Sequence, residues 1–267
     1  MTVSTSQITP SPTTLLNTQP AVKGPTRFLG ILRRCIPLFV VAVVLLLTYL
    51  WISSSDLDSI EQRTLNSDYI ISRIGEHLVL SILAAILVAV LAIPAGIAVS
   101  RSKSKVFTGI VIGLANIGQA TPAIGVVILL AILWQTGFAT ALIALVIYSF
   151  LPVLRNTITG IAQVDPNVRE SAKGMGMTSS QILRRIELPL ASPVILAGLR
   201  TALVFAVGVA TVATFINAGG LGDMIINGLK LQRYPVLVVG AVLVASIAVL
   251  IDWAAGLVEE AVKPRGL

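Results

Sequence analysis

The sequence has little charge and almost none of the residues that build catalytic or metal centres. Charged residues make up 12% of its 267 residues, against roughly 25% in soluble domains, and it holds one cysteine, Cys35, and one histidine, His77. One cysteine excludes an intrachain disulfide, and neither residue has the Cys or His neighbours of a metal site. No G-x-x-x-x-G-K-[ST] loop occurs, which excludes ATP binding by that loop. We expect no catalytic residue, metal or cofactor in this chain, and an interfacial position for His77.

Hydrophobic residues, in contrast, are abundant. They account for 55% of the sequence, and the mean hydropathy is +0.93. Several apolar runs reach the roughly 20 residues that a helix needs to cross a bilayer, and they lack the alternation of membrane barrels. The sequence therefore predicts an all-α integral membrane protein with six spans, at 36–52, 78–99, 106–133, 139–154, 193–215 and 235–257.

The third run, 106–133, is longer than a crossing requires. As a straight helix it would measure about 40 Å, more than the thickness of the hydrocarbon core. Its middle, "NIGQATPAIG" (116–125), contains Pro122, which can bend a helix without ending it. We expect one kinked or tilted span here rather than two.

The distribution of lysine and arginine predicts the orientation. With both termini cytoplasmic, fifteen of the nineteen basic residues, Arg155 and Arg200 among them, belong to the cytoplasmic side and four to the external side. The net charge of +7 then reflects membrane orientation rather than a nucleic-acid surface. We expect a multi-pass protein of the cytoplasmic (inner) membrane that contacts lipid and no nucleic acid.

A polar segment, 165–190, interrupts the apolar pattern on the cytoplasmic side. It begins with Asp165-Pro166, an N-cap acceptor followed by proline at the first helical position, and its glycines at 174 and 176 indicate a helix stop. A capping box that starts at Thr178 predicts a second short helix, which should end before Pro189. Two compact helices outside the membrane would form an element that can dock onto a soluble partner.

The spacing within this segment resembles the membrane subunits of ABC importers. Their pattern is Glu-Ala-Ala, three residues, Gly, nine residues, Ile-x-Leu-Pro, and every spacing is met here, with serine in place of the first alanine. The resemblance implies that the segment fits a groove on an ATPase subunit and couples ATP-driven closure to the spans. It assigns this coupling role to Glu170, Ser171, Ala172, Gly174, Met175, Gly176, Ile182, Ile186, Leu188 and Pro189.

The same resemblance implies the domain plan and the partners. A five-helix type I importer permease core would occupy 77–258, after a disordered cytoplasmic tail (1–34) and a first span with its external loop (35–76), and before a cytoplasmic tail (259–267). The partners would be two ATPase subunits, which bind the ATP and Mg, a second permease chain, identical or sister, and an external substrate-binding protein.

The substrate is implied by family resemblance alone. "GQATPAIGV" (118–126), "YSFLPVLRNT" (148–157) and "ELPLASPVILAGLRTA" (187–202) are similar to the branch that imports glycine betaine, choline and carnitine. The alternatives are a permease for another small zwitterion, such as methionine or a betainised thiol, and a non-transporting scaffold that uses the docking helices to hold a cytoplasmic partner.

Polar residues inside the spans are candidates for a translocation pathway or gate. Such groups are costly in lipid, and those on one helix face can line a pathway, although amides and small residues also stabilise helix packing. A glycine-rich stretch near the external end of the fifth span suits either a gate or a simple turn. The candidates are Asn116, Gln119, Thr121 and Pro122 in the third span, and Thr211, Thr214, Asn217, Gly219 and Gly220 at the end of the fifth.

Two further intramembrane charges, Arg200 and Asp252, lie about two turns from the cytoplasmic ends of antiparallel spans. We expect them to form a structural charge pair.

Overall fold

The computed structural model describes residues 27–262, and every regular element within that range is helical. Contacts divide the chain into two units at Ile36/Pro37, and the account below concerns the second unit. Residues 1–26 and 263–267, which include most of the expected N-terminal tail and the end of the expected C-terminal tail, lie outside the described residues. Residues 27–34, expected to be disordered, belong to a helix.

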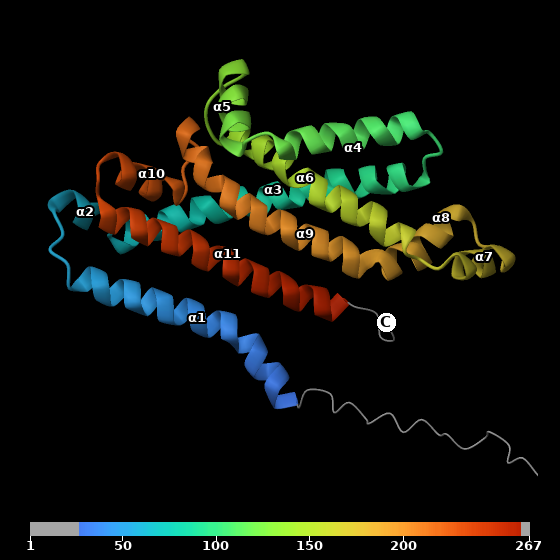
Figure 1. Cartoon of the computed structure of the whole chain (residues 1–267), viewed down its shortest axis with the longest axis horizontal. Helices are drawn as coiled ribbons and strands as arrows, with labels where there is room; N and C mark the ends of the chain where they lie inside the picture. The colour runs from blue at the N-terminus through green and yellow to red at the C-terminus, as the bar shows by residue number, and fades with distance from the viewer. Residues whose placement is uncertain (1–26, 263–267) are drawn as a thin grey trace, which may run out of the picture. The chain divides into compact units, whose positions relative to one another are not determined.

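The helices follow one another with short connections (Figure 1). In chain order they are α1 (Arg27–Ser53), α2 (Ser59–Thr64), α3 (Ser67–Arg101), α4 (Lys105–Ala120), α5 (Ala123–Leu133), α6 (Phe138–Ala162), α7 (Pro166–Gly174), α8 (Ser179–Ile182), the π-helical turn η1 (Leu183–Glu187), α9 (Leu188–Ala210), the 3₁₀ turn η2 (Thr211–Ile216), α10 (Gly222–Lys230) and α11 (Tyr234–Val262).

The described residues contain five stretches that are helical, long and apolar enough to cross a membrane: Cys35–Ser53, Ser67–Arg101, Phe138–Ala162, Ser179–Ile216 and Tyr234–Val262. The bent pair α4 and α5 raises the number to six if it crosses as a unit. The all-helical membrane fold predicted from hydropathy is confirmed.

The pair α4–α5 is more sharply broken than the sequence predicted. α4 ends where the Thr121 N–H bonds to the carbonyl of Ile117, and α5 restarts after Pro122 at an angle of 101°. Proline has no N–H to continue the helix, and the residue before it avoids the helical region. The stretch 106–133 is therefore two helices around a break, and the expectation that it crosses the membrane as one span stays a prediction.

α3 is longer than its apolar run. It begins at Ser67, with the Asn66 side chain accepting a hydrogen bond from the Asp68 N–H at 2.7 Å, and continues for 35 residues, about 52 Å. Its first turns belong to the polar segment that precedes the predicted span at Leu78. Hydropathy marks the membrane-embedded part of a helix, whereas a cap marks where the helix begins.

Small residues bring α3, α6 and α9 into close contact. A Cβ built on Gly96 of α3 would lie 2.6 Å from the Cβ of Thr157 on α6, and one built on Gly198 of α9 would lie 2.7 Å from the Cβ of Asn156. Buried alanines on these three helices complete the contact. Packing through small residues is typical of membrane bundles, where burial of apolar surface from water does not drive association.

His77 is buried inside the bundle, and its expected interfacial depth stays a prediction. Its side chain is 0% exposed, and Nε2 lies 3.1 Å from the carbonyl oxygen of Val207 on α9. Gly220, in the turn before α10, lies beside Nδ1, and a Cβ built there would be 3.2 Å from that atom. The residues that bury His77 are therefore distant from it in the sequence, which is why its burial could not be predicted.

Arg200 and Asp252, which the sequence paired, are in contact between α9 and α11. Arg200 Nε lies 2.5 Å from Oδ1 of Asp252 and Nη2 lies 2.6 Å from Oδ2, a bidentate arrangement, while Nη1 reaches Glu259 at 3.5 Å. The two side chains of the bidentate pair are 35% and 44% exposed. The pair fixes α11 against α9. The end of the bundle that carries α7 is called here the α7 end.

We expect Asp252→Ala to destabilise the protein by about 1–2 kcal/mol, between the values typical of exposed and fully buried pairs. The midpoint of thermal unfolding of the purified chain in detergent measures this loss. Glu259→Ala, which removes the longer contact, should cost less. The exchange Arg200→Asp with Asp252→Arg should recover stability lost in the single variants; an exchanged protein no more stable than either single variant would contradict a specific pair.

Candidate functional site

α7 begins and ends at the residues that the sequence indicated. The Asp165 side chain accepts a hydrogen bond from the Asn167 N–H at 2.8 Å, and Pro166 occupies the first turn. At the other end, Gly176 adopts φ +81°, and the Met177 N–H bonds back to the carbonyl of Ala172 at 3.1 Å. This is a Schellman ending, which requires a left-handed residue and so favours glycine.

The second helix of the segment, α8, starts where the sequence predicted but does not end before Pro189. Thr178 and Gln181 form both bonds of the capping box, at 3.3 and 2.8 Å. The helix then passes through η1 directly into α9, so the expected end before Pro189 is wrong. Proline lacks an N–H, and the wider π turn immediately before α9 lets the helical path continue past it.

The turn between α7 and α8 is the most exposed part of this segment. Met175 is 74% exposed and stands between two exposed glycines, whereas Ala172 and Ile182 are buried beneath it. Of the residues assigned to coupling, Glu170, Ser171, Gly174, Gly176 and Pro189 are also exposed, and Ile186 and Leu188 are half-buried. The segment thus presents a projecting turn on a fixed base. Figure 1 shows it at one end of the helices of the bundle.

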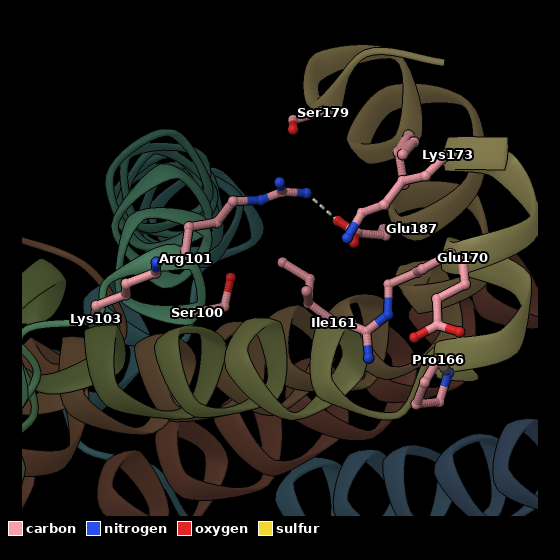
Figure 2. Close-up of a pocket in the computed structure, with 11 residues that line it drawn as sticks. Ser100, Arg101, Lys103, Ile161, Pro166, Glu170, Lys173, Ser179 and Glu187 are labelled. Atoms are coloured by element: carbon pink, nitrogen blue, oxygen red, sulfur yellow. Dashed lines mark hydrogen bonds and ion pairs between the residues drawn. The ribbon is translucent and has the colours of Figure 1, made fainter. Parts of the chain in front are cut away.

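A polar hollow of about 530 Å³ lies between this segment and the end of α3 (Figure 2). Arg101, at the end of α3, makes an ion pair across it with Glu187 of η1, whose side chain is 6% exposed. The pair ties the last turn of α3 to the start of α9. Sequence reasoning missed both residues; an acidic residue between Ile186 and Leu188 was the available signal. The hollow is lined by Ser100, Arg101, Lys103, Ile161, Pro166, Arg169, Glu170, Lys173, Ser179, Ile182 and Glu187.

The glycine-rich turn at the opposite end, the α10 end, is pinned to α3. Glu76 accepts a hydrogen bond from the Gly220 N–H at 2.8 Å and one from Arg73 at 2.7 Å, and Arg73 also reaches Asp223 at 3.0 Å. Gly219 has φ +78°, and a Cβ there would lie 2.4 Å from Oε2 of Glu76. Arg73, Glu76 and Asp223 were not predicted, since their contacts join distant parts of the chain.

The hydroxyl groups of the threonines near this turn bond to backbone carbonyls a few residues away in the sequence. The Thr211 hydroxyl donates to the carbonyl of Gly208 at 2.7 Å, and that of Thr214 reaches the carbonyl of Gly219 at 3.5 Å. Asn217 is left-handed, with φ 60°. These three candidates therefore shape the turn in the observed arrangement.

The candidates at the α4–α5 break lie close to the same region. Asn116 accepts a hydrogen bond from Arg155 of α6 at 2.7 Å, and the Thr121 hydroxyl donates to Ile117 at 2.8 Å. Gln119 is half-buried, and Pro122 marks the break itself. Beyond the break, α5 packs through Val127 against the hydrophobic cluster that contains Ala213 of η2. The structure therefore brings the two groups of candidates to neighbouring elements.

Arg155 was assigned to a cytoplasmic segment from the sequence, but it lies within α6, seven residues before the end of that helix. The side chain is exposed, and Asn116 is its hydrogen-bond partner. Within residues 27–262, no group of three or more His, Cys, Asp or Glu side chains is placed to hold a metal ion.

Comparisons with known proteins agree with these features. Residues 92–264 match a family model described as a binding-protein-dependent transport system inner membrane component. The chain is 42% identical over 202 residues to the glycine betaine/carnitine/choline transport system permease protein OpuCB of Bacillus subtilis (strain 168), over 76% of this chain and 92% of that protein. It is 41% identical, with the same coverage, to the choline transport system permease protein OpuBB of that organism. Among solved structures, inward-facing MetNI methionine ABC transporter aligns with TM-score 0.66 and 20% identity, over 73% of this chain and 96% of that chain.

We expect Gly219→Ala to disrupt the turn before α10, because the added Cβ would overlap Glu76 and the backbone has a positive φ. The free energy of unfolding should fall by about 1–3 kcal/mol. A lower midpoint of thermal unfolding and faster proteolysis within 217–222 would report this loss. Gly75→Ala is the matched control: it lies beside Glu76 in α3, and a Cβ there would meet no atom within 4 Å. Equal behaviour of the two variants would show that Glu76 does not pin the turn.

Proposed function

Because the chain belongs to the family of binding-protein-dependent transport system inner membrane components, we propose that it is the transmembrane permease subunit of an ATP-driven importer of osmoprotectants such as glycine betaine, choline or carnitine. The observation that carries the substrate class is identity of about 42% to permeases that bear these substrates in their names. The likeness to the methionine transporter, at 20% identity, supports the shared fold and gives no support to methionine as substrate.

The α7–α8 segment is the coupling element of this proposal. Its exposed turn would enter a groove on an ATPase subunit. It is joined to the bundle in two ways, through the continuous helix from Ser179 to Ile216 and through the Arg101–Glu187 ion pair. A displacement of the turn would therefore move α9 as a whole and pull on α3.

The proposed assembly contains two such ATPase subunits, which bind ATP and Mg, a second permease chain, identical or sister, and an external binding protein. The α7 end and both termini face the cytoplasm. The pinned turn at 217–223 then faces the external binding protein, at the far end of the helix that begins at the coupling element.

We expect deletion of this gene to abolish high-salt uptake of labelled glycine betaine or choline in cells that lack other osmoprotectant importers, and the wild-type gene to restore it. Labelled methionine and proline serve as comparison substrates. Loss of methionine uptake alone would overturn the substrate class while keeping the permease assignment. No loss for any substrate, together with no substrate-stimulated ATP hydrolysis by the purified complex, would favour a scaffold.

We expect Gly176→Val to uncouple the complex. A β-branched residue is strained at φ +81°, so the projecting turn should lose its shape, and substrate-stimulated ATP hydrolysis should fall roughly tenfold. Gly75→Ala is the control, because Gly75 is helical in α3, outside the coupling segment, and a Cβ there would meet no atom within 4 Å. Wild-type uptake and co-purification of the ATPase with Gly176→Val would contradict the coupling role.

A further inference from the structure

We propose that Arg155, held by Asn116, forms an anion-recognition point on the wall of the translocation pathway and contacts the carboxylate of zwitterionic substrates during passage. The proposal rests on the transport function proposed above and adds a residue that distinguishes betaine-type compounds from choline, which has no carboxylate.

The first support is the position of the guanidinium. Arg155 lies seven residues inside the end of α6, about 10 Å along the axis, and Asn116 lies eleven residues inside α4, about 16 Å from its start at Lys105. An arginine near a membrane surface normally extends towards the headgroups. Here the side chain is bonded to Asn116 of α4 at 2.7 Å, which holds the guanidinium against the neighbouring helix.

The second support is the absence of a compensating charge. All twelve acidic residues of the sequence fall within residues 27–262, and none of them makes an ion pair with Arg155 in that part of the chain. A second copy of this chain could supply only the same carboxylates, which lie near the ends of the bundle or, as with Asp252, are already paired. Among residues 27–262, Arg155 is thus a charged donor that no carboxylate pairs.

The third support is exposure. Arg155 is exposed, and the helix that carries it, α6, packs against the apolar helices α4 and α9. A charge at this depth that faced hydrocarbon would be very costly, so the face must be turned towards water or protein. In a permease made of two chains, that space is the pathway between them.

Aromatic side chains occupy the same face further along. Tyr148 precedes Arg155 by seven residues, two helical turns, and so points to the same side of α6. Its ring packs against Phe205 of α9, with centroids 6.0 Å apart and an interplanar angle of 59°, and Phe205 is 36% exposed. Aromatic faces attract quaternary ammonium groups.

The proposed pathway wall therefore carries a guanidinium for the carboxylate of a betaine-type molecule and an aromatic pair for its quaternary ammonium group. The two lie about 10 Å apart along α6. The two charges of such a small molecule are closer together than that, so the molecule would meet the aromatic pair and the guanidinium in succession. Asn116 uses one N–H of the guanidinium, which leaves the others for a carboxylate. A cation without a carboxylate would gain nothing from Arg155.

The test compares initial rates of glycine betaine and choline uptake by the complete transporter in cells without other osmoprotectant importers. Arg155→Gln removes the charge, Arg155→Lys keeps it, and Arg63→Gln, at an exposed site in α2, is the control. Rates are divided by the amount of complex in the membrane. We expect Arg155→Gln to lower betaine uptake about tenfold relative to choline, Arg155→Lys to retain most of the wild-type ratio, and Arg63→Gln to leave it unchanged.

Asn116→Asp tests the same point without removing Arg155. A carboxylate at this position would neutralise the guanidinium in place, so betaine uptake should again fall relative to choline even if Arg155→Gln fails to reach the membrane. If the wild type transports only carboxylate-bearing compounds, the expected result is loss of their uptake in Arg155→Gln and Asn116→Asp and retention in Arg155→Lys.

Three results would overturn the inference alone: equal losses for both substrates in the neutralised variants, no loss for either, or a wild-type transporter that carries choline and no carboxylate-bearing compound. A wild-type protein that carries neither substrate would overturn the proposed function, and the inference with it. The two failures are therefore distinguished before any variant is made.

Discussion

The close approach of α3 and α9 to α6 is the constraint on which the other features depend. At Gly96 and Gly198 there is no space for a Cβ, so the three helices are held at a short distance by backbone and small side chains. This spacing lets His77 on α3 reach the carbonyl of Val207 on α9. A wider separation would break that contact and leave a buried imidazole without its partner, which is costly in an apolar interior.

The same packing turns α9 into a continuous connection between the two ends of the molecule. The helical path from Ser179 to Ile216 begins at the α7–α8 turn and ends beside the turn that Glu76 pins. α3 runs alongside and is fastened at both ends, by Arg101 to Glu187 and by Glu76 to Gly220. A rotation of α9 must therefore strain both fastenings, which gives a physical route by which the proposed coupling element could act on the proposed gate.

The sequence predicted features set by neighbouring residues, and one long-range pair, Arg200 with Asp252, because few charges lie within the spans; it missed the other long-range contacts. Hydropathy located the spans, and the caps at Asp165 and Thr178 located the starts of α7 and α8. The Arg101–Glu187 pair joins residues 86 apart, and the Glu76–Gly220 bond joins residues 144 apart, so no local pattern contains them. The continuation of the helix past Pro189 was missed for another reason. A proline normally ends an α-helix because it cannot donate the next backbone hydrogen bond, but here a π-helical turn just before it changes the hydrogen-bond pattern.

The arrangement of charges separates structural from functional roles in a chain that has few of them. Arg73, Arg101 and Arg200 each contact a carboxylate, and a paired arginine presents little net charge to a passing solute. In the described part of the chain, the hydrogen-bond partner of Arg155 is an amide, which orients the guanidinium without neutralising it. An oriented, exposed cation on an apolar helix is therefore the charge of this bundle that is best placed to meet an anionic group from outside the chain.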